Sequence, residues 1–264
     1  MKLVRPVSAV LLLFGLSLGL FAFQRGGRRQ QSYYSGGPSV PSEFYFSRLQ
    51  YNSIYGGGFR GETWSQDWPK ADNDCLIALR RLTRINSPSP LNVADLDSDH
   101  LFDYPWIYAI NPEYWSFTDE EAKRLHDYLL KGGFLMVDHF HGTDDWERFM
   151  AAIRQVLPDA QVEDLNDPDE IYHVLYDINE RFQIPGEQYV GTGRTYECGG
   201  GNNCGYVAKW RAIRNSHGRI MVAICHNMHL GDAWEHSDEA SYPEKFSGLA
   251  FRIVLNYITY SMTH

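Results

Sequence analysis

The sequence lacks two patterns that would indicate particular classes of protein, a long basic run and an internal repeat. It carries 24 lysines and arginines against 33 aspartates and glutamates, for a net charge of −9. A nucleic-acid groove needs clustered lysine and arginine to displace counterions from phosphates, so we expect no nucleic-acid partner. Without a repeat, a solenoid is also excluded.

The usual signatures of a reactive site are missing as well. The chain has four cysteines, and Cys225 stands between Ile224 and His226 instead of on a glycine-flanked elbow. We therefore interpret Cys225, like Cys75 in a predicted helix, as a small core residue. No HExxH zinc motif occurs.

A glycine-rich loop at residues 56–61 lacks the lysine of a phosphate-binding loop, so it is interpreted as a structural turn. Its Arg60 follows the first predicted strand and is a candidate ligand-binding residue that faces a cleft.

What remains is the composition of an ordinary globular protein, with 44% hydrophobic and 22% charged residues. At the N-terminus, Lys2 and Arg5 precede an apolar run from Val7 to Phe23. We expect residues 1–23 to be a signal peptide or a membrane anchor, and residues 24–42, rich in Gly, Ser and Pro, to be a flexible linker. This predicts export to the cell envelope, either periplasmic or membrane-anchored, and a folded domain over residues 43–264.

Strands and helices alternate in the middle of that domain. Residues 44–51 and 106–110 have the composition of strands, and residues 134–137 are an uninterrupted apolar run that suits a strand buried on both faces. Thr118 and Glu121 form a capping box that predicts a helix ending at Gly132-Gly133. A second helix is predicted from the apolar spacing between Trp146 and Leu157.

The last third of the chain predicts two strands, residues 207–213 and 219–225, joined by a turn, and a helix from Pro243 to about Met262. Alternating strands and helices with short connections are typical of parallel sheets. The prediction is therefore an α/β fold in three layers, with a mostly parallel sheet and flanking helices.

Two predicted turns carry most of the candidate chemistry, because ligands of open α/β sheets bind beyond the carboxyl ends of the strands. The first turn is residues 138–142 and the second is residues 226–235. Candidate catalytic residues are Asp138, His139, His141 and Glu235. Candidate metal ligands are His139, His141 and His226, and candidate ligand-binding residues are Arg60, Trp146, His226, Asn227, Asp232 and Trp234.

Imidazole and carboxylate groups could bind a divalent transition metal such as zinc, or could serve as a general acid and base. The alternative is structural: Asp144 caps the helix that follows the first turn, Asp138 helps in the same place, and the histidines tie loops together. Separately, Cys198 and Cys204 flank a flexible segment and are a candidate disulfide in an oxidising compartment.

The chain resembles the bacterial domain of unknown function family 4159 over nearly all of residues 43–264. The matching stretches are residues 44–51, WSQDWPKADNDCLIALRRLTR (64–84), GGFLMVDHFHG (132–142), GDAWE (231–235) and the closing NYITYSMTH. The resemblance implies a class I glutamine amidotransferase-like, or flavodoxin-like, fold. It also implies an envelope setting beside von Willebrand A and MoxR-type proteins as partners.

The resemblance supplies no activity. True amidotransferases carry a cysteine after the central strand, where this chain has Asp138 and His139, so glutaminase chemistry is not expected. Trehalose-utilisation relatives have a similar Gly-Gly-strand-His arrangement. An acidic residue is commoner than histidine at position 139 in family 4159, so the resemblance does not imply a two-histidine metal site.

Three hypotheses for function follow. The first is an envelope domain that binds a ligand or partner between the two turns without glutaminase activity. The second is a metal-assisted hydrolase acting on a small or sugar-like substrate. The third is a structural component of a membrane assembly.

Overall fold

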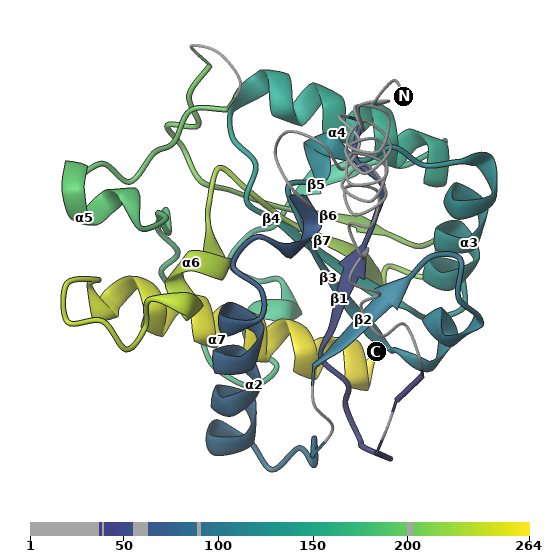
Figure 1. Ribbon diagram of the computed structural model, residues 1–264, viewed down its shortest axis with the longest axis horizontal. Helices are drawn as coiled ribbons and strands as arrows, with labels where there is room; N and C mark the ends of the chain where they lie inside the picture. Colours follow the sequence, from purple (N-terminus) through teal and green to yellow (C-terminus); the bar gives the residue numbers. More distant parts are fainter. Residues whose placement is uncertain (1–36, 39, 55–62, 89–90, 200–202) are drawn as a thin grey trace, which may run out of the picture. The chain divides into compact units, whose positions relative to one another are not determined.

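Seven strands form one sheet in the order β2-β1-β3-β4-β7-β6-β5 (Figure 1). The computed structural model describes residues 37–38, 40–54, 63–88, 91–199 and 203–264. The strands are β1 (Ser47–Gln50), β2 (Asn92–Asp95), β3 (Trp106–Ile110), β4 (Phe134–Asp138), β5 (Val162–Asp164), β6 (Lys209–Arg214) and β7 (Ile220–His226).

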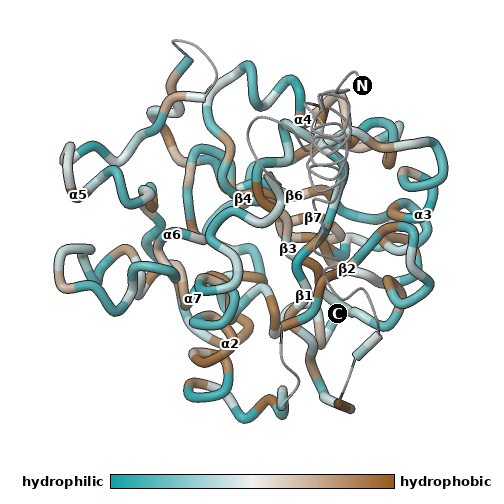
Figure 2. The backbone as a smooth tube through the Cα atoms, viewed as in Figure 1, coloured by the Kyte–Doolittle hydropathy of each residue, from teal (hydrophilic) through white to brown (hydrophobic). Residues whose placement is uncertain are grey.

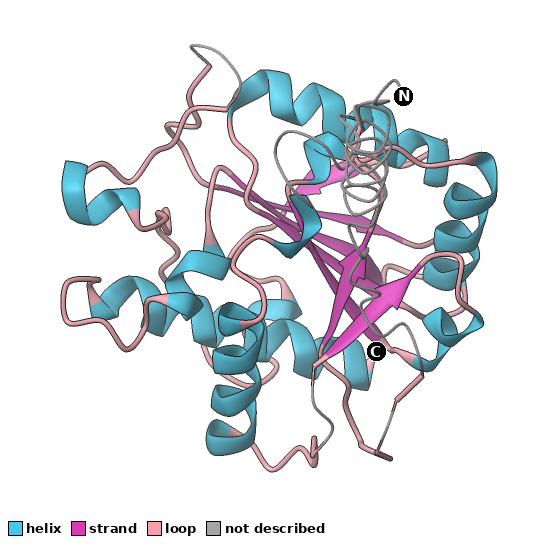
Figure 3. Ribbon diagram, viewed as in Figure 1, coloured by secondary structure: helices cyan, strands magenta, loops and turns pink. Residues whose placement is uncertain are grey.

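The sheet is mostly parallel. The five strands from β2 to β7 pair in parallel, and β6 and β5 complete the sheet with antiparallel pairs. The predicted α/β fold with three layers is confirmed (Figure 3). β4 is the central strand, with three strands on either side, and all five of its residues are buried.

Helices cover the two faces of the sheet. Helices α2, α6 and α7 contact one another on one face, and α3 and α4 contact each other on the opposite face (Figure 1). The helices are α2 (Lys70–Leu82), α3 (Asp119–Leu130), α4 (Gly142–Val156), α5 (Gln188–Thr192), α6 (Leu230–Glu235) and α7 (Glu244–Thr263), and the short 3₁₀ turns are Thr63–Ser65, Asp99–Asp103, Pro112–Tyr114 and Glu170–Tyr172.

Helix α3 begins at the predicted capping box. The Thr118 hydroxyl accepts a hydrogen bond from the Glu121 amide at 3.1 Å, and the Glu121 carboxylate accepts one from the Thr118 amide at 2.7 Å. The helix ends before Gly132, which takes a positive φ of 107° that glycine adopts without strain. Local sequence therefore sets both ends of this helix.

The core between the sheet and α7 is rich in aromatic side chains. Trp106 and Tyr108 of β3 stack with their ring centroids 6.0 Å apart, and the fully buried Trp234 lies against Tyr108. The central strands β3, β4 and β7 are accordingly hydrophobic (Figure 2). The aromatic residues thus fill the core, as the composition suggested.

One buried ion pair attaches α2 to the sheet. Arg48 of β1 donates from Nε to Asp72 of α2 at 3.0 Å, makes a second contact to the same carboxylate, and lies over the Tyr108 ring. Because neither charge is exposed, loss of one partner would leave the other unpaired in the core. No sequence pattern indicated this pair.

The structure corrects several predicted boundaries. The first strand covers Ser47–Gln50 instead of residues 44–51, because the chain before it hydrogen-bonds to an irregular segment: the Ser87 hydroxyl donates to the Phe44 carbonyl. Strands β2 and β5 were not predicted.

The run Val7–Phe23 and the glycine loop at residues 56–61 lie outside the described residues. Among the residues that are described, no helix has the length and apolar character needed to cross a membrane.

Candidate metal centre

Two histidine-bearing turns meet at one edge of the sheet. The first follows β4 and the second follows β7, and these strands are parallel neighbours, so their carboxyl ends share an edge. The rings of His139 and His229 stack with centroids 3.4 Å apart, and the His141 ring lies 5.6 Å from that of His139. Sheet topology thus assembles three imidazoles from two separate turns.

Each turn contains a residue in the left-handed region, where side chains other than glycine are uncommon. His139 has a φ of 59° and Asn227 a φ of 65°. The conformation of His139 reverses the chain between β4 and α4, which begins at Gly142. The rings of His139 and His141 are therefore adjacent across a sharp strand-to-helix turn.

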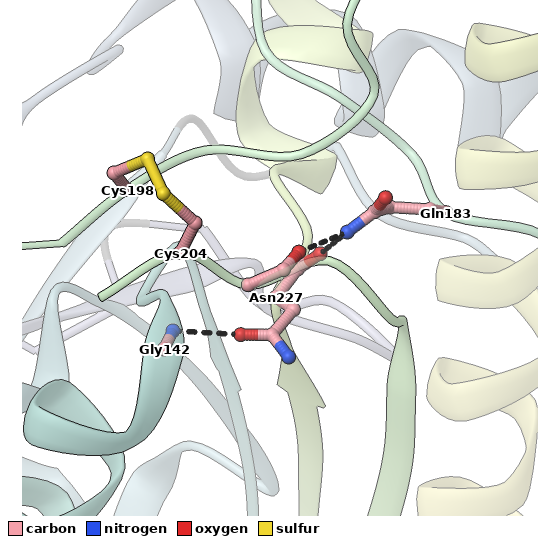
Figure 4. The surroundings of a disulfide bond; sticks show 6 residues. Gly142, Gln183, Cys198, Cys204 and Asn227 are labelled. Atoms are coloured by element: carbon pink, nitrogen blue, oxygen red, sulfur yellow. Dashed lines mark hydrogen bonds between the residues drawn. A yellow bond between two sulfur atoms is a disulfide. The ribbon is translucent and has the colours of Figure 1, made fainter. Parts of the chain in front are cut away.

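Asn227 ties the two turns together. Its Oδ1 accepts a hydrogen bond from the Gly142 amide at 2.8 Å (Figure 4). Its backbone amide donates to the Phe140 carbonyl at 3.0 Å. Gln183 donates to the Asn227 carbonyl at 2.9 Å. Asn227, a candidate ligand-binding residue, therefore has its side chain engaged in holding the site together.

Asp138 is also engaged within the protein. Its Oδ2 accepts hydrogen bonds from the Tyr108 hydroxyl at 3.0 Å and from the amides of Leu230 and Gly231 at 2.7 and 3.1 Å. It is fully buried, and burial raises its pKa to about 6. The contacts to Leu230 and Gly231 place Asp138 at the start of α6, whereas the structural alternative expected it at the start of α4, beside Asp144.

Three carboxylates surround the imidazoles. Asp67 lies 2.9 Å from His229 Nε2, and Asp232 lies 3.2 Å from His229 Nδ1. Glu197 lies between two histidines, with Oε1 3.7 Å from His229 Nδ1 and Oε2 3.8 Å from His141 Nε2. These last two separations exceed hydrogen-bond length.

Several buried ring nitrogens of this cluster have no hydrogen-bond partner among the described residues. They are Nδ1 of His139 and both ring nitrogens of His141, whereas Nδ1 of His229 has the Asp232 carboxylate 3.2 Å away. An unpaired buried polar atom costs about 1–3 kcal/mol, so native structures seldom leave several together. Such a group of atoms is the expected appearance of a ligand-binding site.

The donor atoms fall into two overlapping sets suited to a metal ion. Asp67, His139 and His229 form one set, and His139, His141 and Glu197 form the other; within each set the donor atoms lie within 4.8 Å of one another. Two imidazoles and one carboxylate are a ligand set used by zinc and by non-haem iron.

Burial and charge determine the protonation states. Burial lowers the pKa of His141 to about 4 and that of His139 well below its ordinary value, so both rings are neutral at neutral pH. Burial alone would lower the pKa of His229 too, but Asp232 and Asp67 outweigh it and raise that pKa well above the usual value. Neutral imidazole is the form that binds metals.

The carboxylates carry more charge than the histidines neutralise. Burial acts to raise the pKa values of Asp67 and Glu197, but the positive charge of His229 outweighs it and lowers both. Burial raises the pKa of Asp232. Even with Asp232 protonated, Asp67 and Glu197 together exceed the single charge of His229, so the site favours an added cation.

The other predicted site residues lie around this cluster or apart from it. His226 does not join the donor sets: its Nε2 is 3.0 Å from the Gly142 carbonyl and its ring packs on Trp146, which itself lies under Arg211. Trp234 is part of the core, without exposed surface. Glu235 belongs to a different set of possible metal ligands, with Asp232 and His236, that does not include His139. Arg60 lies outside the described residues.

Sequence reasoning missed Asp67 and Glu197. Asp67 precedes α2 with a φ of 63°, and Glu197 lies in the irregular segment between α5 and β6. Neither follows a predicted strand. Asp67 does lie in the stretch 64–84 that carries the family resemblance, and Glu197 directly precedes Cys198 of the candidate disulfide, which the structure forms with Cys204 (Figure 4).

Comparison with known proteins gives a family but no activity. The model of a family described as a domain of unknown function (DUF4159) matches residues 45–262, which include every donor of the cluster. A comparison with curated proteins found no match.

Proposed function

We propose that this chain, which belongs to the DUF4159 family, is a metal-dependent hydrolase whose divalent transition metal is held by His139, His141 and Glu197. The observation that carries the proposal is the group of buried imidazole nitrogens without hydrogen-bond partners that faces ionised carboxylates. Of the hypotheses drawn from the sequence, this favours the metal-assisted hydrolase over a purely structural domain.

The distances fit a shared ion better than direct pairing. Zinc binds nitrogen and oxygen ligands at about 2.0–2.2 Å, which places two ligands of one tetrahedral ion roughly 3.4 Å apart. The separation of 3.8 Å between His141 Nε2 and Glu197 Oε2 is too long for a hydrogen bond and within reach of a common ion. These atoms are therefore positioned as ligands of one cation.

A set of three protein ligands leaves a coordination position open for water or substrate. A metal bound there would polarise an electrophilic group and lower the pKa of a bound water toward neutrality. The Glu197 side chain is 21% exposed, so the centre has contact with solvent.

His229 and Asp67 are positioned to move the proton of the attacking water. Asp67 accepts a hydrogen bond from Nε2 of His229 and so fixes the orientation of that ring. A divalent cation beside His229 would lower its pKa, which frees Nδ1 to accept a proton. In hydrolysis the water oxygen bonds to the electrophilic carbon, its proton passes to His229, the bond to the leaving group breaks, and His229 returns the proton to the leaving group.

The absence of an accessible thiol argues against cysteine chemistry at this site. The free cysteines Cys75 and Cys225 are buried, and burial raises both thiol pKa values well above the ordinary value. The sharp turn after β4, where His139 has a positive φ, resembles a nucleophile elbow without its nucleophile. This supports kinship with class I amidotransferase-like folds together with loss of glutaminase activity.

The proposal extends to location and substrate. A disulfide between Cys198 and Cys204 is suited to an oxidising compartment, which supports an exported protein of the cell envelope. The surplus of carboxylates around the centre disfavours anionic ligands, so we expect a small neutral substrate, with sugar-like molecules included.

Metal content tests the proposal directly. The purified full chain is loaded with Zn²⁺, Mn²⁺ or Fe²⁺, passed through a desalting column and measured by elemental analysis, beside His139→Ala/His141→Ala and the exposed-site control His217→Ala. We expect about one ion per chain in the wild type and control, and at least a tenfold lower content in the double variant.

Two results would overturn the proposal: no retained metal in the wild type, or equal retention in the double variant. If the chain retains metal but hydrolyses nothing in a broad ester, amide and glycoside screen, the binding function stands and the hydrolase assignment is wrong.

A further inference from the structure

A disulfide lies directly beside a proposed metal ligand. Cys198 and Cys204 are bonded to each other and pair across a short antiparallel bridge (Figure 4). Glu197 immediately precedes Cys198, and its carbonyl accepts a hydrogen bond from the amide of Gly205, the residue after Cys204, at 2.8 Å. The cross-link therefore closes the backbone on which Glu197 stands.

Glu197 needs such a constraint more than the other donors do. His139, His141 and His229 lie within three residues of a buried strand, whereas Glu197 belongs to the irregular segment between α5 and β6. Its carboxylate has one direct backbone donor among the described residues, the Gly186 amide at 3.1 Å. A side chain on an irregular segment keeps its position only when that segment is fixed by other contacts.

The cross-linked segment is anchored on both of its sides. Asn203 donates from Nδ2 to Asp144 at 2.9 Å and also contacts Thr143, both in the first turn of α4. On the other side, Gln183 donates to the Gly205 carbonyl at 2.6 Å. Both anchors hold the strand around Cys204, and the disulfide joins that strand covalently to the strand that carries Glu197.

The fit against the histidine turn is close. A Cβ atom at Gly199 would lie 2.5 Å from the His141 carbonyl and 2.2 Å from Asp145 Oδ2, nearer than real Cβ atoms approach. The segment can therefore take up this position only with the backbone pressed against the turn that carries His141.

We infer that the Cys198–Cys204 disulfide positions the Glu197 carboxylate in the metal centre, so that metal affinity depends on the oxidation state of this pair. The inference rests on the proposed function. A cross-link removes conformational freedom from the segment before metal binds, and the bound state then costs less ordering entropy.

The pair is chemically accessible. Cys198 is exposed, whereas the remaining cysteines, Cys75 and Cys225, are fully buried, so a thiol reagent acts first at this disulfide. In the reduction, dithiothreitol gives up two electrons and two protons and closes into its cyclic disulfide. The Cys198–Cys204 bond accepts them and becomes two thiols.

A double-mutant cycle tests the inference with Zn²⁺ as the probe. Zinc affinity is measured by chelator competition for the full-length wild type, Cys198→Ser/Cys204→Ser, Glu197→Gln and the triple variant, with Val207→Ser as a control at an exposed neighbouring position. We expect roughly 10–100-fold weaker binding in the disulfide variant and in Glu197→Gln. The triple variant should be no weaker than Glu197→Gln, because both changes remove the same ligand.

Reduction of the wild type supplies a second measurement should the serine variant fail to fold. The protein is reduced, desalted under argon and titrated, then reoxidised and titrated again; affinity should fall on reduction and return on reoxidation. If the wild type binds zinc and its affinity is unchanged by reduction or by serine substitution, this inference is wrong while the metal centre stands. Additive losses in the triple variant would likewise overturn it, and a wild type without zinc affinity would remove both proposals.

Discussion

The rings of His139 and His229 lie stacked at 3.4 Å between centroids and 16° between planes, although one follows β4 and the other β7. Two imidazolium cations in such contact would repel each other, so at most one of the two rings is in the charged form, with both of its nitrogens protonated. The carboxylates beside His229 favour its charged form, and the pKa of His139 is correspondingly lowered by burial and by its charged neighbour. In the proposed centre, this asymmetry would separate a ligand, His139, from a proton carrier, His229.

The first prediction concerns Asp67→Asn. Asparagine keeps the shape of the side chain and tolerates the φ of 63°, but removes the charge that raises the His229 pKa. We expect the His229 pKa in the metal-free protein to fall, as measured by NMR titration of the histidine rings. Hydrolysis should slow by roughly 10²–10⁴-fold, because an unsupported His229 is a poorer proton carrier.

His217→Ala is the control for that titration, since its exposed ring lies outside the cluster. An unchanged His229 pKa in Asp67→Asn would show that the pair at 2.9 Å does not govern the protonation of this ring.

The second prediction concerns Gly186→Ala. A Cβ atom there would lie 2.5 Å from Asp232 Oδ2, 2.6 Å from His229 Nδ1 and 2.8 Å from Glu197 Oε1. The added methyl group must displace these side chains, so we expect at least a tenfold loss of metal affinity together with a lower thermal midpoint. Gly191→Ala is the matched control, because a Cβ at that position meets open space. Equal affinities in the two variants would contradict the placement of the centre.

The third prediction concerns the pH dependence of stability and Glu113. Burial, reinforced by the nearby Asp145, raises the pKa of Glu113 to about 8 from an ordinary value of 4.5. Between these two values the folded protein binds more protons at this site than the unfolded chain does. The free energy of unfolding should therefore fall as pH rises from 4.5 to 8, by up to about 1.4 kcal/mol per pH unit from this group.

Urea unfolding of the wild type and Glu113→Gln at pH 5, 7 and 9 measures this contribution. The variant should lose that component of the slope and become the more stable of the two at pH 9. If both proteins show the same dependence on pH, Glu113 does not titrate as its burial implies.

The sequence predicted those helices and strands whose ends or buried faces are marked by neighbouring residues. The capping box at Thr118 predicted the start of α3, and the apolar runs predicted β3 and β4. Strand β2 was missed because Asn92–Asp95 has neither alternation nor an apolar run, and it becomes a strand through its pairing with β1. Such tertiary pairing leaves little trace in a short segment.

Some residues of the candidate site could likewise be predicted from the sequence, and others could not. His139, His141 and Asp232 could be singled out because they follow predicted strands, where ligands bind in α/β sheets. Asp67 and Glu197 could not, because they reach the histidines through the packing of irregular segments. Conversely, Trp234 and Asp138 stand in the predicted turns, yet the structure engages them in the core and at the start of α6.

The donors Asp67, His139, His141, Glu197 and His229 come from segments that are distant along the chain and meet only where β4 and β7 pair. No short fragment contains enough of them to compete for a scarce ion. In the proposed centre, metal capture should therefore be a late event, possible only once β4 and β7 have paired, and a nascent or cleaved chain would remain unloaded. Occupancy of the centre would then report whether the whole domain has reached its native arrangement.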